Sequence, residues 1–167
     1  MNKLNNIALI GMAGVGKSFV GRHLAEKLGY SYVELDKLIT CEAGKIGVNK
    51  DLLADNEFIK LEEKIVLGLD GKNNSVFDTG GSVIYSSKAM GFLKLNSVVI
   101  YLKDSVENTT KRFDDRGELH LVGIKGKTFD KLLEERNKLY EKYADFSINV
   151  FECKNSQDIL NKIVALV

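Results

Sequence analysis

Apolar positions along the chain follow two alternating patterns. Short apolar runs such as Ile7–Ile10 and Val98–Leu102 are typical of strands buried on both faces. Longer segments such as Leu52–Leu69 carry apolar residues at helical spacing. The pattern predicts strands at 4–10, 32–34, 75–77, 97–102 and 146–151, and helices at 17–28, 37–43, 52–69, 88–95, 105–113, 128–143 and 156–167.

Alternating strands and helices predict an α/β fold. We expect an open, doubly wound sheet of five parallel strands between two layers of helices. The length of 167 residues suits one domain over 1–167. Residues 114–126 show weak hydrophobic periodicity and include the three glycines Gly117, Gly123 and Gly126, so a mobile lid is predicted there. Ligands in such folds bind beyond the carboxyl ends of the strands.

Residues 11–18 read Gly-Met-Ala-Gly-Val-Gly-Lys-Ser and fit the pattern G-x-x-x-x-G-K-[ST] at every fixed position. A predicted strand precedes them and a predicted helix follows, the order that defines a phosphate-binding loop. Glycines let consecutive backbone N–H groups turn toward phosphate oxygens, and the start of the helix adds further donors. Lys17 supplies a mobile charge for the outer phosphates, and the Ser18 hydroxyl is a ligand for Mg²⁺. The predicted nucleotide-binding residues are Gly11, Met12, Ala13, Gly14, Val15, Gly16, Lys17, Ser18 and Phe19.

Acidic residues follow two of the predicted strands. Glu34 and Asp36 end the second strand, and Asp78 closes the third. Phosphoryl transfer needs a carboxylate to hold Mg²⁺, and often one to orient or deprotonate the attacking hydroxyl. If the strand continues to residue 36, Glu34 and Asp36 point to the same side. Alternatively, Asp36 caps the helix predicted at residue 37, and Asp78 suits a metal role or a turn equally.

Composition narrows the classes of partner. The formal net charge of +1 provides no basic field for nucleic acid. No apolar run approaches the ~20 residues of a membrane span, and the early first strand leaves no room for a signal peptide. Cys41 and Cys153 form no CxxC pair, so we expect buried thiols in a reducing cytoplasm. The expected partner is a small molecule, bound by a monomer.

Taken together, these motifs resemble the shikimate kinase family, small P-loop kinases built like nucleoside-monophosphate kinases. The resemblance covers nearly the whole chain. Glu34-Leu35-Asp36 matches an Asp-Thr-Asp run, Phe58–Glu62 a Phe-Arg-x-x-Glu segment, and Thr79–Val83 a Gly-Gly-Gly-Ala-Val turn. Arg112 matches an arginine that begins the lid, and Arg136 lies in an Arg-x-x-x-Tyr helix.

The resemblance implies ATP and Mg²⁺ as cofactors and transfer of the γ-phosphate to a hydroxyl of a small cyclic carboxylate. Shikimate, phosphorylated at its 3-hydroxyl in aromatic amino acid biosynthesis, is the leading acceptor. The resemblance also implies a role for each matching residue. Asp36 would be the base, Glu34 would be linked to the metal, and Arg112 would pack near adenine. The acceptor would be held by Gly80, Gly81 and Arg136.

The chain departs from the family pattern at two arginines. The acceptor-binding arginine falls on Ile59, and the adjacent Lys60 points about 100° away on a helix. The family's Arg-Pro-Leu-Leu segment in the lid aligns with Leu119–Val122 here. The family arginine that would reach the transferring phosphate is therefore a leucine in this chain. Three lid residues are candidates to replace it: Arg116, His120 and Lys125. These departures leave two alternatives: a kinase for another polyol, cyclitol or sugar acid, and a non-catalytic nucleotide-binding regulatory protein. A third alternative is a nucleoside or nucleotide kinase of similar build.

Overall fold

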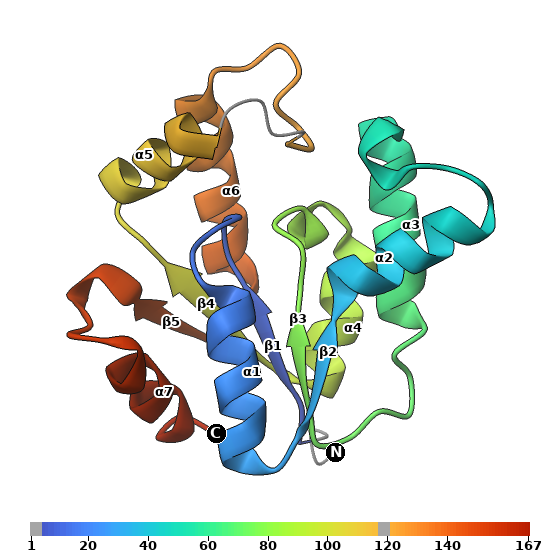
Figure 1. Ribbon diagram of the computed structural model, residues 1–167. Helices are drawn as coiled ribbons and strands as arrows, with labels where there is room; N and C mark the ends of the chain where they lie inside the picture. Colours follow the sequence, from blue (N-terminus) through green and yellow to red (C-terminus); the bar gives the residue numbers. More distant parts are fainter. Residues whose placement is uncertain (1–4, 117–120) are drawn as a thin grey trace.

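The computed structural model describes residues 5–116 and 121–167, and it contains one parallel sheet with strand order β2-β3-β1-β4-β5 (Figure 1). The strands are β1 (Ile7–Ile10), β2 (Ser31–Glu34), β3 (Ser75–Asp78), β4 (Val98–Lys103) and β5 (Phe146–Asn149). Leu9 at the centre lies opposite Asp78 of β3 and Ile100 of β4. The predicted open, five-stranded parallel sheet is therefore confirmed.

Helices cover both faces of this sheet. They are α1 (Lys17–Leu28), α2 (Leu35–Lys45), α3 (Asp55–Leu67), α4 (Ser87–Asn96), α5 (Val106–Arg116), α6 (Phe129–Tyr143) and α7 (Ser156–Val164). Because side chains alternate along a strand, Ile7 and Leu9 pack with α1 and α7, whereas Ala8 and Ile10 pack with α4 and α6 (Figure 1). Both faces of β1 are buried, which explains its unbroken apolar run.

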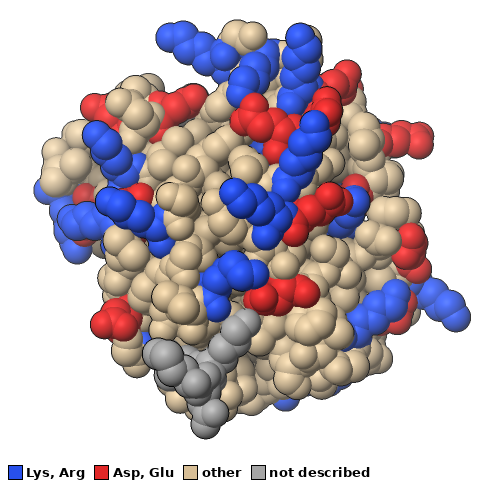
Figure 2. All heavy atoms as spheres, turned by 180° about the vertical axis from the view of Figure 1, so that it is seen from behind, with Lys and Arg blue, Asp and Glu red and all other residues tan. Residues whose placement is uncertain are grey.

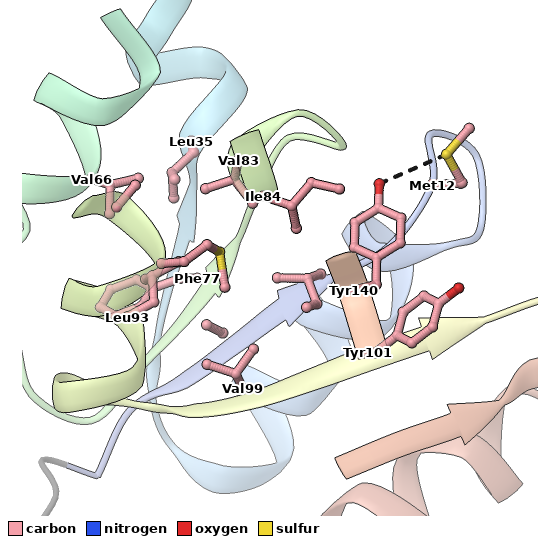
Figure 3. Close-up of a cluster of buried hydrophobic side chains, with 14 of the residues drawn as sticks. Met12, Leu35, Val66, Phe77, Val83, Ile84, Leu93, Val99, Tyr101 and Tyr140 are labelled. Atoms are coloured by element: carbon pink, nitrogen blue, oxygen red, sulfur yellow. Dashed lines mark hydrogen bonds between the residues drawn. The ribbon is translucent and has the colours of Figure 1, made fainter. Parts of the chain in front are cut away.

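The core on the α4 and α6 face reaches up to the phosphate-binding loop. Phe77, Val99 and Tyr101 from the strands meet Leu93 of α4 and Tyr140 of α6 (Figure 3). The rings of Tyr101 and Tyr140 stack with their centroids 4.9 Å apart. This packing anchors α6 against β4, and so determines where the polar residues of α6 lie.

Element boundaries differ from the prediction where the ligand-binding edge is built. Helix α2 begins at Leu35, two residues earlier than predicted, because β2 passes directly into it. Asp36 therefore lies in the first turn of α2. The sequence predicted two positions for Asp36 in the secondary structure, in the strand beside Glu34 or as the cap of the next helix, and both are wrong. Helix α3 begins only at Asp55, and residues 50–52 form the separate 3-10 helix η1 (Lys50–Leu52).

The surface carries mixed charge. On the face opposite to that of Figure 1, Lys and Arg side chains are interspersed with Asp and Glu (Figure 2). Across residues 5–116 and 121–167, none of the helices has the length and apolar character needed to span a bilayer. The expectation of buried thiols is wrong, because Cys41 is exposed on α2 and Cys153 is half-buried.

Candidate active site

The phosphate-binding loop joins β1 to α1 and depends on its glycines. Gly11, Gly14 and Gly16 have φ angles of +144°, +81° and +100°, a region that side chains with a Cβ rarely adopt. A Cβ on Gly11 would lie 2.6 Å from the carbonyl oxygen of Leu102. Gly16 is the N-cap of α1, so the unpaired N–H groups of the first helical turn follow the loop directly. The loop therefore has the local geometry of an anion site.

Lys17 lies inside this loop. Its side chain is buried, and its ammonium donates hydrogen bonds of 2.9 Å to the carbonyl oxygens of Gly11 and Met12. These contacts hold the positive charge at the loop, where phosphate oxygens would be bound. The hydroxyl of Ser18, the next residue, lies beside that of Tyr32.

Two carboxylates are gathered near the same tyrosine. The Tyr32 hydroxyl donates to Asp78 Oδ2 at 2.8 Å. Burial, this hydrogen bond and the nearby charge of Glu34 raise the pKa of Tyr32 above its ordinary value. The Glu34 carboxylate also pairs with the ammonium of Lys37 at 2.8 Å. Tyr32 thus links Ser18, Asp78 and Glu34, three groups that sequence reasoning had considered for Mg²⁺.

This donor set fits Mg²⁺. The metal prefers hydroxyl and carboxylate oxygens and keeps several waters, so it is bound through few protein groups together with phosphates. The described part of the chain contains no cluster of three or more His, Cys, Asp or Glu side chains able to hold a metal.

A cleft of about 170 Å³ lies next to the phosphate-binding loop. It is lined by Ala13 of the loop, Asp36 of α2, Gly80 and Gly81 after β3, and Arg136 of α6. The residues that the resemblance assigned to the acceptor, far apart in the sequence, are thereby brought together in one place.

The turn after β3 is tightly packed against this cleft. A Cβ on Gly80 would lie 2.4 Å from Glu62 Oε1, and one on Gly81 would lie 3.0 Å from Arg136 Nη1. The Tyr140 hydroxyl donates a 2.7 Å hydrogen bond to the Gly81 carbonyl oxygen. Glycine at both positions therefore lets the backbone approach the carboxyl and guanidinium groups closely.

Arg136 connects the cleft to the described end of the predicted lid. Its side chain is buried, and Nη2 donates to the carbonyl oxygen of Val122 at 2.7 Å. From the other side, the Gly123 N–H donates to Asp55 Oδ2 at 2.8 Å. Leu121 and Val122 are buried and line the cleft. Segment 121–126 is thus held between α6 and α3.

The lid residues considered as replacements for the missing arginine lie elsewhere. Lys125 is exposed and lies beside Asp55 and Asn56 at the start of α3. Leu119 and His120 lie outside the described residues, and the side chain of Arg116 is likewise not described.

A second, smaller hollow adjoins the acceptor cleft. Arg112 lines it together with Phe113 and Phe129, whose rings stack with centroids 4.1 Å apart. Ala13 and Leu121 line both hollows, so Arg112 lies near the phosphate-binding loop. The Phe19 side chain is exposed and packs on His23 instead.

Glu62 is a site residue to which sequence reasoning assigned no role. It is buried on α3, where its Oε2 accepts a 2.7 Å hydrogen bond from Ser82 Oγ. Burial raises its pKa to about 7, although the Ser82 hydrogen bond and the Arg136 charge oppose the shift. Two signals were available: Glu62 is the final residue of the segment that resembles Phe-Arg-x-x-Glu, and it lies four residues from both Phe58 and Val66, on the apolar stripe of the helix.

Comparison with known proteins agrees with this geometry. A protein-family model described as shikimate kinase matches residues 13–167. The chain belongs to the shikimate kinase family. It is 34% identical to a shikimate kinase of Aeromonas salmonicida, over 100% of this chain and 99% of that one. It is 35% identical to a shikimate kinase of Persephonella marina, over 98% of this chain and 99% of the relative.

A solved structure shows the same fold. The shikimate kinase from Acinetobacter baumannii in complex with shikimate superposes with a TM-score of 0.76 at 31% identity, covering 98% of this chain and 92% of that chain. As a member of the shikimate kinase family, the protein is an ATP-dependent kinase that uses Mg²⁺ and transfers phosphate to a hydroxyl.

The departures from the family pattern remain visible in this shikimate kinase fold. Ile59 is half-buried, and Lys60 is exposed on α3. The described lining of the acceptor cleft includes neither of them, but it does include Lys50 of η1. Sequence reasoning did not find Lys50, because it lies in a connecting segment without periodicity or motif.

Proposed function

We propose that this protein phosphorylates the 3-hydroxyl of shikimate with ATP, in the cleft beside the phosphate-binding loop. One observation carries the proposal: Ala13 of the loop, the Asp36 carboxylate and the Arg136 guanidinium line the same cleft. A hydroxy acid needs a cation for its carboxylate and a carboxylate for its reacting hydroxyl. The cleft provides both next to the site where the nucleotide's phosphates are expected.

Asp36 is the proposed base. It orients the acceptor hydroxyl and accepts its proton as the new O–P bond forms and the bond from the γ-phosphorus to the β–γ bridging oxygen breaks, which releases ADP. Lys17 stabilises negative charge on the transferring phosphoryl group, and the main-chain N–H groups of residues 11–18 position that group. The acceptor is held by Gly80, Gly81 and Arg136.

Mg²⁺, when bound, neutralises charge on the nucleotide's phosphates. Ser18 and Glu34 are proposed to hold it, with Asp78 as a further candidate because the Tyr32 hydroxyl connects it to Ser18. On the nucleotide side, we assign the hollow lined by Arg112 to adenine, and Phe19 contributes its backbone N–H.

Segment 114–126 is proposed to act as the lid, although its first three residues form the end of α5 and not part of a loop as predicted. Leu121 and Val122, in its described part, line the cleft and are themselves buried. Apolar cover of this kind excludes water, which would otherwise compete for the phosphoryl group. We propose that the protein acts as a monomer.

The direct test measures ADP release in the presence of each candidate acceptor and identifies the phosphorylated product by mass spectrometry. We expect shikimate 3-phosphate, and kcat/KM for shikimate at least about tenfold above that of other cyclitols, polyols and sugar acids. Preference for another member of this panel would show that the acceptor differs from shikimate. Nucleotide binding with no transfer to any acceptor would instead favour the regulatory alternative.

A further inference from the structure

The acceptor cleft contains a lysine that its surface position does not explain. Lys50 begins η1, in the connection between α2 and α3, yet its side chain is only 16% exposed. Lysines in surface connections usually extend into water. This one turns inward and lines the cleft together with Asp36, Gly81 and Arg136.

Lys50 has donors available for an anion. Its ammonium contacts Asp36 Oδ1, which uses one of the three N–H donors that an ammonium carries. Of the described residues that line the cleft, Lys50 and Arg136 are the two cations, and Asp36 and Asp51 are the two anions. An acidic ligand would therefore add a negative charge that needs a cationic partner.

Arg136 by itself is poorly placed to be the only cationic partner of an acidic ligand. One end of its guanidinium already donates to the Val122 carbonyl, and the other lies 3.6 Å from the Met12 sulfur. A carboxylate removed from water loses much of its hydration, and it is bound tightly only if several charge-assisted hydrogen bonds replace that hydration. A second cation in the cleft would supply further hydrogen bonds of this kind.

The neighbouring candidates for this second cation are excluded by their positions. Ile59 has no charge, and Lys60 is exposed on α3 outside the cleft lining. We propose that Lys50 binds the carboxylate of the acceptor together with Arg136, and that it makes the site selective for acids over neutral polyols. This inference rests on the proposed function, because it concerns the same cleft.

The alternative role for Lys50 is to hold Asp36 in position without touching the acceptor. The two roles predict different kinetics. A residue that binds the carboxylate contributes to the binding of an acid and not to that of its uncharged ester. A residue that only positions the base affects turnover of both compounds equally.

The test compares Lys50→Met with the matched control Lys60→Met, using shikimate and its methyl ester as acceptors. For Lys50→Met, we expect KM for shikimate to rise about 10- to 100-fold, the value of a hydrogen bond to a charged group, with kcat changed less than about threefold. The KM for the ester should rise much less than the KM for shikimate, and the KM for ATP should remain near the wild-type value. Lys60→Met should resemble the wild type throughout.

A conservative variant separates lost binding from disturbed folding. Lys50→Arg keeps a cation at the same position, so we expect its KM for shikimate to stay close to the wild-type value. An unchanged KM for shikimate in Lys50→Met would overturn the inference, and so would an equal loss of kcat for acid and ester. If the wild type phosphorylates another hydroxy acid instead, the proposed acceptor is wrong, and the same comparison on that acid and its ester still decides the role of Lys50.

Discussion

The hydroxyl of Tyr140 donates a 2.7 Å hydrogen bond to the carbonyl oxygen of Gly81, joining α6 to the turn that lines the acceptor cleft. The same hydroxyl lies 3.7 Å from the sulfur of Met12 in the phosphate-binding loop (Figure 3). Burial raises the pKa of Tyr140 above its ordinary value, so the phenol remains a neutral donor. One side chain of the core therefore contacts both the nucleotide and the acceptor sides of the site.

Tyr140→Phe should weaken both folding and acceptor binding. Losing this buried hydrogen bond costs about 1–2 kcal/mol of unfolding free energy, and the released Gly81 turn should lower kcat/KM for the acceptor several-fold. Tyr101→Phe is the matched control, because its hydroxyl donates to Asn137 Oδ1 at 2.9 Å, away from the cleft. Urea unfolding should show similar losses for the two variants, and steady-state kinetics should show a loss only for Tyr140→Phe. Equal kinetic losses would contradict a specific role for Tyr140.

Lys17→Ala should abolish transfer with the fold retained. The ammonium is the charge that the loop presents to the phosphates, so its removal should lower kcat by at least about 10²- to 10³-fold. The buried carbonyls of Gly11 and Met12 lose their ammonium donor, so we expect a modest loss of stability with the fold retained. Circular dichroism checks the fold, and Lys27→Ala, an exposed change on the same helix, should remain active. Near-normal turnover in Lys17→Ala would contradict the assignment.

Asp36→Asn should separate chemistry from nucleotide binding. The amide keeps the shape of the side chain but cannot accept the proton, so kcat should fall about 10²- to 10⁴-fold. The affinity for ATP should stay within about twofold, which calorimetric titration measures. Asp51→Asn removes another carboxylate that lines the same cleft and should retain most of the turnover. The role of Asp36 as base is wrong if both variants behave alike.

Glu62 should make stability depend on pH. Burial raises its pKa from 4.5 to about 7 in the folded protein. Between these values the folded state holds more protons than the unfolded state, so the unfolding free energy falls as pH rises from about 4.5 to 7 and then levels off. The full effect is roughly 3 kcal/mol.

Glu62→Gln removes this titration. The difference in unfolding free energy between wild type and variant, measured by urea unfolding at pH 5 and pH 8, should therefore change by a large part of that amount. Parallel pH profiles for the two proteins would show that Glu62 does not titrate in this range.

The phosphate-binding loop and the order of elements could be predicted from sequence because both depend on residues close together in the chain. Eight consecutive residues, 11–18, determine the loop through their backbone angles and donors. The run of apolar residues at Ile7–Ile10 and the helical spacing at Phe58, Leu61 and Ile65 reflect local periodicities of strand and helix. Resemblance to a family added Asp36, Gly80, Gly81 and Arg136, which the cleft brings together.

Tertiary structure decided the features that depend on segments far apart in the chain. Periodicity cannot show that β2 passes directly into α2, which moves Asp36 onto a helix. Nor can it show that Lys50 turns inward to Asp36, or that Glu62 is buried against Ser82 with a raised pKa. The physical reason is common to these cases. A side chain's charge state and direction follow from its burial and its partners, and those are determined by how α2, α3 and α6 pack around the sheet.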